Sequence, residues 1–77
     1  MKVVVYSAEW CPWCERVKEF LREHGIEFEE KNVEIKENGE ELVRISGQEG
    51  IPVTVVNDKE VIIGFDEEKL KKALNIK

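Results

Sequence analysis

Two cysteines with two residues between them are the part of this sequence best suited to chemistry. Cys11 and Cys14 enclose Pro12 and Trp13, and they are the only cysteines among the 77 residues. A pair with this spacing, in a chain that starts without a recognisable secretion signal, indicates a redox dithiol or half of a metal site. A purely structural disulfide is disfavoured, because closing so short a loop removes little entropy from the unfolded chain.

The position of the pair relative to a helix decides how reactive the thiols are, because the thiolate is the attacking species. Pro12 is tolerated in the first turn of a helix, and Cys14 and Leu21 lie on an apolar stripe with helical spacing, which predicts a helix over residues 12–24. Cys11 would then precede the first turn, where unpaired N–H groups and the helix dipole stabilise negative charge. We therefore assign Cys11 as the nucleophile and Cys14 as the resolving thiol.

Metal binding is the alternative use of such a pair. A structural zinc site takes four ligands, and beyond the two cysteines the chain offers only His24. An iron–sulfur cluster bridging two copies of the chain would need only two cysteines from each, so a dimeric cluster-binding module stays open as an alternative. Disulfide exchange itself requires no metal or organic cofactor, and we expect none.

The remaining sequence predicts the elements that hold this pair. Residues 2–6 are β-branched and aromatic and indicate a buried strand, and residues 26–29 alternate like a second strand after Gly25 ends the first helix. A second helix is expected over residues 36–46. The C-terminal third then predicts a β-hairpin with strands at 52–56 and 60–63, followed by a helix that Asp66 caps.

The expected order of elements is βαβαββα. A strand–helix–strand unit places its two strands in parallel, and a hairpin then adds antiparallel strands to the same sheet. The sequence therefore predicts an α/β fold with a four-stranded mixed sheet flanked by three helices, in one domain spanning residues 1–77.

Composition narrows the partners that such a domain would bind. Charged residues make up 38% of the chain, and the formal net charge is -5 with the basic residues scattered along it. Nucleic acids and anionic membranes are therefore disfavoured as partners. The N-terminal apolar run is too short for a signal sequence or a membrane span, so we expect a cytoplasmic protein. We also expect a monomer, as is usual for small proteins that carry electrons on a dithiol.

Three segments in this order, YSAEWCPWCERVKEF, GIPVTVV and IGFDEEKL, resemble a glutaredoxin over nearly the whole chain. Within that family the sequence is similar to the NrdH-type redoxins, which carry electrons to ribonucleotide reductase and similar acceptors. The resemblance implies the thioredoxin fold, an active-site loop at residues 11–14 and a cis-proline loop at residues 50–52. The cis isomer of Pro52 would expose the backbone of Ile51 to an incoming extended substrate chain.

The resemblance also implies further substrate-binding residues. Gly64 and Asp66 match a loop that holds the amino end of a ligand, although Asp66 could serve only as a helix cap. Trp10 and Trp13 flank the nucleophile and would form an exposed docking patch for a protein partner, together with Pro12. The alternative for Trp10 is burial beneath the loop. Arg16 and Lys18 could offset the acidic residues near the thiolate or simply form a solvated helix face.

Departures from the family pattern indicate which molecule would reduce the dithiol again after each reaction. Ala8 stands where glutaredoxins usually have a lysine that helps to hold glutathione, and Gly50 replaces a frequent threonine. The last motif is reduced to Gly64-Phe65-Asp66-Glu67. We therefore expect a thioredoxin reductase to recharge the dithiol, with a glutathione-dependent glutaredoxin as the alternative.

Overall fold

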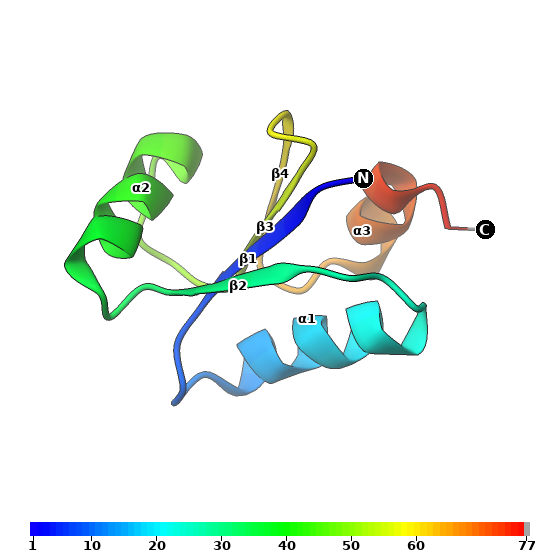
Figure 1. The fold of residues 1–77 in the computed structure, drawn as a ribbon, viewed down its shortest axis with the longest axis horizontal. Helices are drawn as coiled ribbons and strands as arrows, with labels where there is room; N and C mark the ends of the chain where they lie inside the picture. The colour runs from blue at the N-terminus through cyan, green and yellow to red at the C-terminus, as the bar shows by residue number, and fades with distance from the viewer. Residues whose placement is uncertain (77) are drawn as a thin grey trace.

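The computed structural model describes residues 1–76 as a four-stranded sheet with three helices around it (Figure 1). The elements are β1 (Val3–Ser7), α1 (Pro12–Glu23), β2 (Glu29–Asn32), α2 (Lys36–Ser46), β3 (Val53–Val56), β4 (Glu60–Ile63) and α3 (Glu67–Leu74). The strand order is β2-β1-β3-β4, with β1 parallel to β2 and antiparallel to β3, and with β3 antiparallel to β4. The predicted fold class and the βαβαββα order are confirmed.

The two faces of the sheet have separate cores because successive side chains of a strand point to opposite faces. Val3 and Val5 of β1 pack with α1 and α3, whereas Val4 and Tyr6 pack with Leu42 of α2. The helices therefore divide into two layers, with α1 and α3 on one side of the sheet and α2 on the other. All five residues of β1 are buried, which makes this strand the centre of the fold.

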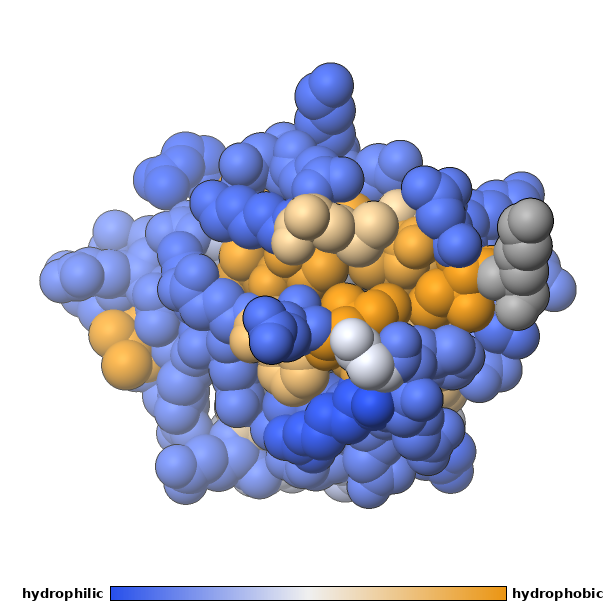
Figure 2. All heavy atoms as spheres, turned by 45° about the vertical axis from the view of Figure 1, so that its right-hand side comes forward, coloured by the Kyte–Doolittle hydropathy of each residue, from blue (hydrophilic) through white to orange (hydrophobic). Residues whose placement is uncertain are grey.

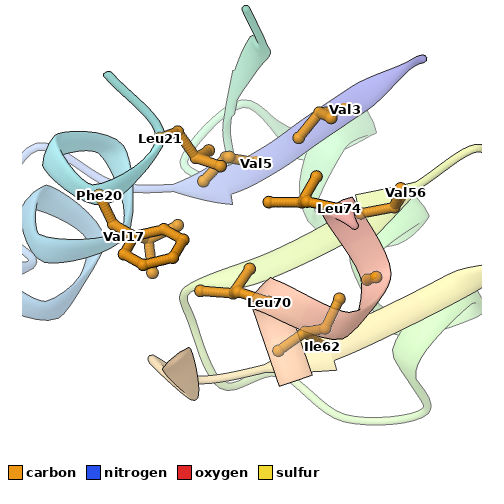
Figure 3. Packing of buried hydrophobic residues seen from close by; sticks show 10 residues of the cluster. Val3, Val5, Val17, Phe20, Leu21, Val56, Ile62, Leu70 and Leu74 are labelled. Atoms are coloured by element: carbon orange, nitrogen blue, oxygen red, sulfur yellow. The ribbon is translucent and has the colours of Figure 1, made fainter. Parts of the chain in front are cut away.

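The larger core lies between the sheet and the pair of helices α1 and α3. Figure 3 shows side chains from both helices and from β1 pointing into one shared space. This core consists of Val3, Val5, Val17, Phe20, Leu21, Val56, Ile62, Leu70, Ala73 and Leu74. Because α1 contributes three of these residues, the helix whose N-terminal end carries the dithiol is packed against the sheet.

The second strand lies further along the chain than the sequence predicts. The prediction placed it at residues 26–29, but pairing with β1 begins at Glu29, opposite Val4. The N–H of Ile26 donates to the carbonyl of Leu21 and so completes the end of α1, where Gly25 has a φ of 67°. Ile26 and Phe28 nevertheless pack against the core. Their alternation reflects the burial of side chains in a loop, not the pairing of a strand.

Apolar side chains also reach the surface on the face of the molecule drawn in Figure 2, where they gather in a band bordered by polar residues. Ile26, Phe28, Phe65 and Ile76 are partly buried at the edge of the larger core.

Within residues 1–76 no helix has the length and apolar character that crossing a membrane requires.

Candidate functional site

The two cysteines lie where β1 passes into α1. Their sulfurs are at disulfide-bonding distance, and their Cα atoms are 5.3 Å apart. Cys11 is 4% exposed and Cys14 is fully buried, and Ala8 completes a small cluster with both. The sequence predicted a shielded Cys14 and a more accessible Cys11. Cys14 is indeed the less exposed of the two cysteines, although Cys11 is also almost completely buried in the bonded pair.

The sulfur of Cys11 forms the N-cap of α1. The backbone N–H of Cys14 donates to it at 3.2 Å, and Pro12 occupies the first turn of the helix, as its fixed φ favours. The carbonyl of Cys11 accepts a hydrogen bond from the N–H of Glu15. A negative charge on this sulfur would therefore be stabilised by a direct hydrogen bond and by the positive end of the helix dipole.

A second loop packs against the pair. The Ile51–Pro52 peptide bond is cis, which confirms the isomer that the resemblance implied. Ile51 and Val33 pack against the cysteine cluster, and Pro52 is buried. The N–H of Gly64 donates to the carbonyl of Pro52 at 2.8 Å, so the end of β4 is tied to this loop. Residues 11–14, 51–52 and 64, which are distant in sequence, are thus brought together.

Both tryptophans beside Cys11 are exposed. Trp10 is 69% exposed and Trp13 is 55% exposed, so burial of Trp10 beneath the loop is wrong. Trp13 stacks with Phe65 at a centroid distance of 6.4 Å, and the guanidinium of Arg16 lies 5.5 Å from the Trp13 ring centre. Phe65 is therefore a site residue that the sequence analysis did not select. Its position directly after Gly64 was the available signal.

A shallow recess of about 300 Å³ lies next to the dithiol. Its lining consists of Trp13, Ile51, Pro52, Gly64 and Phe65, all of them uncharged. Asp66 follows Phe65 and caps α3, because its carboxylate accepts a hydrogen bond from the N–H of Lys69 at 3.1 Å. The helix-cap role of Asp66 is thus observed, next to the recess.

A charged cluster lies beside the segment that joins β1 to α1. Lys18 is 6% exposed, and its ammonium contacts Glu15 at 2.7 Å and Glu30 at 2.8 Å. The hydroxyl of Ser7 donates to Glu30 at 2.7 Å. A solvated helix face is therefore wrong for Lys18. Its spacing of four residues from Cys14 and three from Leu21 places it on the buried stripe, which was a signal in the sequence.

These contacts shift the pKa values of the cluster. Burial works to lower the pKa of Lys18, but its hydrogen bonds to Glu15 and Glu30 outweigh burial and raise that pKa above its ordinary value. The hydrogen bonds from Lys18 and then from Ser7 hold the pKa of Glu30 below its usual value. Lys18 and Glu30 are consequently both charged throughout the neutral pH range.

Comparison with known proteins agrees with this geometry. The glutaredoxin family model matches residues 3–61. An uncharacterized glutaredoxin-like 8.6 kDa protein in a rubredoxin operon of Clostridium pasteurianum is 36% identical over 74 residues, which cover 94% of this chain and 96% of that protein.

Two solved structures are also similar. A glutaredoxin from Archaeoglobus fulgidus superposes with a TM-score of 0.87 and 35% identity, over 95% of this chain and 85% of that one. A mutant of the thioredoxin-like protein BC3987 superposes with a TM-score of 0.88 and 36% identity, over 99% of this chain and 97% of that one. The chain therefore belongs to the glutaredoxin family and is a thiol–disulfide oxidoreductase with the thioredoxin fold.

Proposed function

We propose that this protein is a dithiol electron carrier of the NrdH-redoxin type, which reduces disulfides in proteins and is recharged by a thioredoxin reductase rather than by glutathione. The observation that carries the choice of reductant is the uncharged recess beside the dithiol, formed by Trp13, Ile51, Pro52, Gly64 and Phe65. Such a surface favours the apolar side chains and backbone of a protein partner.

Glutathione would need positively charged groups around the recess beside the dithiol. The tripeptide carries two carboxylates and one ammonium, and a site that holds it benefits from cations for the carboxylates. Here Glu49, Asp66 and Glu67 lie within two residues of the recess lining, and the nearby Arg16 is placed over the ring of Trp13. Ala8, at the position of the usual lysine, is buried against the cysteines. This excess of negative charge disfavours an anionic ligand.

The reaction follows from the placement of the two sulfurs. The Cys11 thiolate attacks one sulfur of a substrate disulfide, an S–S bond forms between Cys11 and the substrate, and the other substrate sulfur leaves as a thiolate that takes up a proton. Cys14 then loses its proton and attacks the sulfur of Cys11. This step forms the Cys11–Cys14 disulfide and releases the second substrate thiol. Two electrons and two protons supplied through the reductase restore the dithiol.

The surrounding residues are assigned to substrate binding. We place the extended substrate chain along Ile51 and Pro52, where the backbone of Ile51 forms the strand-like hydrogen bonds. Trp10, Pro12 and Trp13 contact the substrate surface around the disulfide. Gly64 allows the chain to approach closely, and the Asp66 carboxylate binds an amino group of the substrate. These groups come from three separate loops and are held in place by the sheet.

The setting of this reaction is the cytoplasm, where thiols are kept reduced and a carrier of reducing equivalents has a use. We propose one domain, residues 1–77, that acts as a monomer, with protein disulfides such as that of ribonucleotide reductase as substrates.

The test is NADPH consumption with a protein disulfide as acceptor and two alternative sources of electrons. Thioredoxin reductase alone should support turnover, and glutathione with glutathione reductase should support at most about a tenth of that rate. The Cys11→Ser variant controls for direct reduction of the acceptor by either reductase. Turnover that requires glutathione would overturn the proposed reductant, and no turnover with either system would overturn the proposed function as a whole.

A further inference from the structure

The two edge strands of the sheet differ in the side chains that they present. In the order β2-β1-β3-β4, the strands β2 and β4 each leave one row of backbone groups without a strand partner within residues 1–76. β2 has the sequence Glu-Glu-Lys-Asn, and charged residues of this kind discourage pairing with another chain. β4 has the sequence Glu-Val-Ile-Ile, with Val61 37% exposed and Ile63 53% exposed. The β4 edge therefore lacks the protection that charge gives to the β2 edge.

The exposed side chains of β4 lie on the α2 face of the sheet. Ile63 is opposite Val53 and Val61 is opposite Val55 in the ladder with β3. Both valines of β3 belong to the core that contains Leu42 of α2. Directly opposite residues of two paired strands point to the same face, so Val61 and Ile63 continue this apolar face to the end of the sheet.

The other face of the β4 edge carries a groove next to α3. The groove has a volume of about 360 Å³ and is lined by Glu60, Val61, Ile62, Lys69 and Lys72. The two lysines are three residues apart on one helix and therefore share a face. Within residues 1–76 neither lysine forms an ion pair with a carboxylate. Both positive charges are thus available to a ligand lying along the strand.

The β4 edge begins at the recess beside the dithiol. Ile63 is followed by Gly64, which lines that recess and is bonded to the carbonyl of Pro52. The hairpin of β3 and β4 then projects from the molecule between α2 and α3 (Figure 1). A strand of four residues spans about 13 Å, so a segment of four to six residues leaving the recess would cover the edge of β4.

We propose that the outer edge of β4 binds an extended segment of the substrate protein as an additional strand, in which apolar and acidic residues alternate. Successive side chains of such a strand point to opposite faces. One set packs on Val61 and Ile63, and the other set places carboxylates at Lys69 and Lys72. The inference rests on the proposed reduction of protein disulfides and adds a sequence requirement next to the reacting cysteine.

The experiment uses synthetic peptides whose single cysteine carries thionitrobenzoate in a mixed disulfide. Attack of the reduced protein on the peptide sulfur expels thionitrobenzoate as a thiolate, and its visible absorbance gives the rate. One peptide ends close to the cysteine. Three others continue through a two-glycine linker into a six-residue arm, in which valine alternates with glutamate, glutamine or lysine.

The glutamate arm should raise the second-order rate constant at least about fivefold over the short peptide, and added salt should reduce this gain. The lysine arm should give no gain. This order is the reverse of the one that the net charge of -5 would produce by long-range attraction alone. A faster lysine arm would therefore overturn the proposal.

Two pairs of variants locate the effect on the protein. Lys72→Gln should slow the reaction of the glutamate-arm peptide about threefold and leave the short peptide unchanged. Its matched control is Lys71→Gln, the next residue on the same helix but outside the groove lining. Val61→Glu makes the β4 edge resemble β2 and should remove the gain, whereas the same change at the exposed Val43 of α2 should not.

The outcomes separate this inference from the proposed function. Equal rates for all four peptides, or equal effects of Lys72→Gln and Lys71→Gln, would reject the β4 site and leave the dithiol function intact. No release from any peptide would reject both. A dimer in sedimentation that Val61→Glu dissociates would place a second copy at this edge instead of a substrate. If Val61→Glu fails to fold by circular dichroism, the comparison of the two lysine variants decides.

Discussion

The backbone N–H of Cys14 donates a hydrogen bond to the sulfur of Cys11 at 3.2 Å. The first cysteine thus takes the place of the serine or aspartate that commonly caps a helix, and its sulfur receives the N–H group that such a side chain would satisfy. In the reaction proposed above, the same contact orders the pair, because the residue that would supply the resolving thiol also holds the proposed nucleophile. The sulfur of Cys11 is therefore both the cap of α1 and the atom proposed to react.

This relationship predicts different failures for the two cysteines. Cys11→Ser should reduce insulin-disulfide reductase activity at least about a hundredfold while changing the free energy of unfolding by less than about 1 kcal/mol, because serine also caps a helix. Cys14→Ser should still attack the substrate but should be unable to release it. Mass spectrometry should show a mixed disulfide accumulating on Cys11 in the second variant, and full activity of Cys11→Ser would contradict the assignment of the nucleophile.

The stacked pair of Trp13 and Phe65 predicts a loss of substrate recognition that depends on substrate size. Trp13→Ala removes half-exposed aromatic surface beside the sulfurs. We expect kcat/KM for a protein disulfide to fall about tenfold, as an aromatic contact residue at an interface can contribute, while reduction of hydroxyethyl disulfide changes less than about twofold. Steady-state kinetics with both substrates measures the difference.

The control for this prediction is Val43→Ala, which removes an exposed apolar side chain from α2. It should leave both substrates unaffected. Equal losses with the protein and with the small disulfide in Trp13→Ala would show that the tryptophan acts on the thiols themselves rather than on docking.

Local sequence signals were sufficient for most of the fold. Pro12 marked the start of α1, Asp66 marked the cap of α3, and the second helix spans Lys36–Ser46 as predicted. The hairpin turn was also predictable, since Asn57 and Asp58 both have positive φ, which these residue types tolerate. Caps and turns are determined by a few neighbouring residues, so they can be identified without knowledge of the tertiary contacts.

The features that the sequence analysis missed, although weak local signals existed for Lys18 and Phe65, depend on contacts between distant segments. Lys18 is buried because Glu30, on another element, meets it, and Trp13 is flanked by Phe65 from the far end of the chain. The position of β2 is determined by its register against β1, which places Glu29 opposite Val4. Apolar alternation around Phe28 indicated burial correctly but could not distinguish a paired strand from a loop packed on the core.

Gly64 has a backbone conformation that favours glycine, and it also lines the recess. The effect of the first on stability and of the second on substrate binding can be measured separately. Its φ is 79°, and an added Cβ would meet nothing within 4 Å, so Gly64→Ala should cost about 1 kcal/mol through the backbone alone. Gly25 has a φ of 67° and equally open surroundings at the end of α1, which makes Gly25→Ala the matched control.

Both glycine variants should unfold at a similarly reduced urea concentration. If Gly64 allows close approach of the substrate, only Gly64→Ala should also lower kcat/KM for a protein disulfide, by roughly threefold or more. Identical kinetics for the two variants would remove Gly64 from the substrate-binding residues and leave it a purely structural role.

The last prediction concerns acid stability and a network on the other face of the sheet. The buried Tyr6 hydroxyl donates to the Glu41 carboxylate, which also receives the ammonium of Lys31 at 2.7 Å. The hydrogen bond from Lys31, and then the one from Tyr6, hold the pKa of Glu41 below its ordinary value of 4.5. The folded state therefore binds fewer protons at this group than the unfolded state, so stability is fully present above that value and is lost as the pH falls through the lower pKa of the folded protein.

Urea unfolding at pH 7, 5 and 3.5 measures this dependence. The wild-type protein should lose stability between the last two pH values, and Glu41→Gln should lose less over the same interval, because its amide does not titrate. Glu27→Gln, a change at an exposed glutamate before β2, serves as the control and should follow the wild-type curve. A Glu41→Gln curve parallel to wild type down to pH 3.5 would mean that Lys31 and Tyr6 do not stabilise the ionised carboxylate in solution.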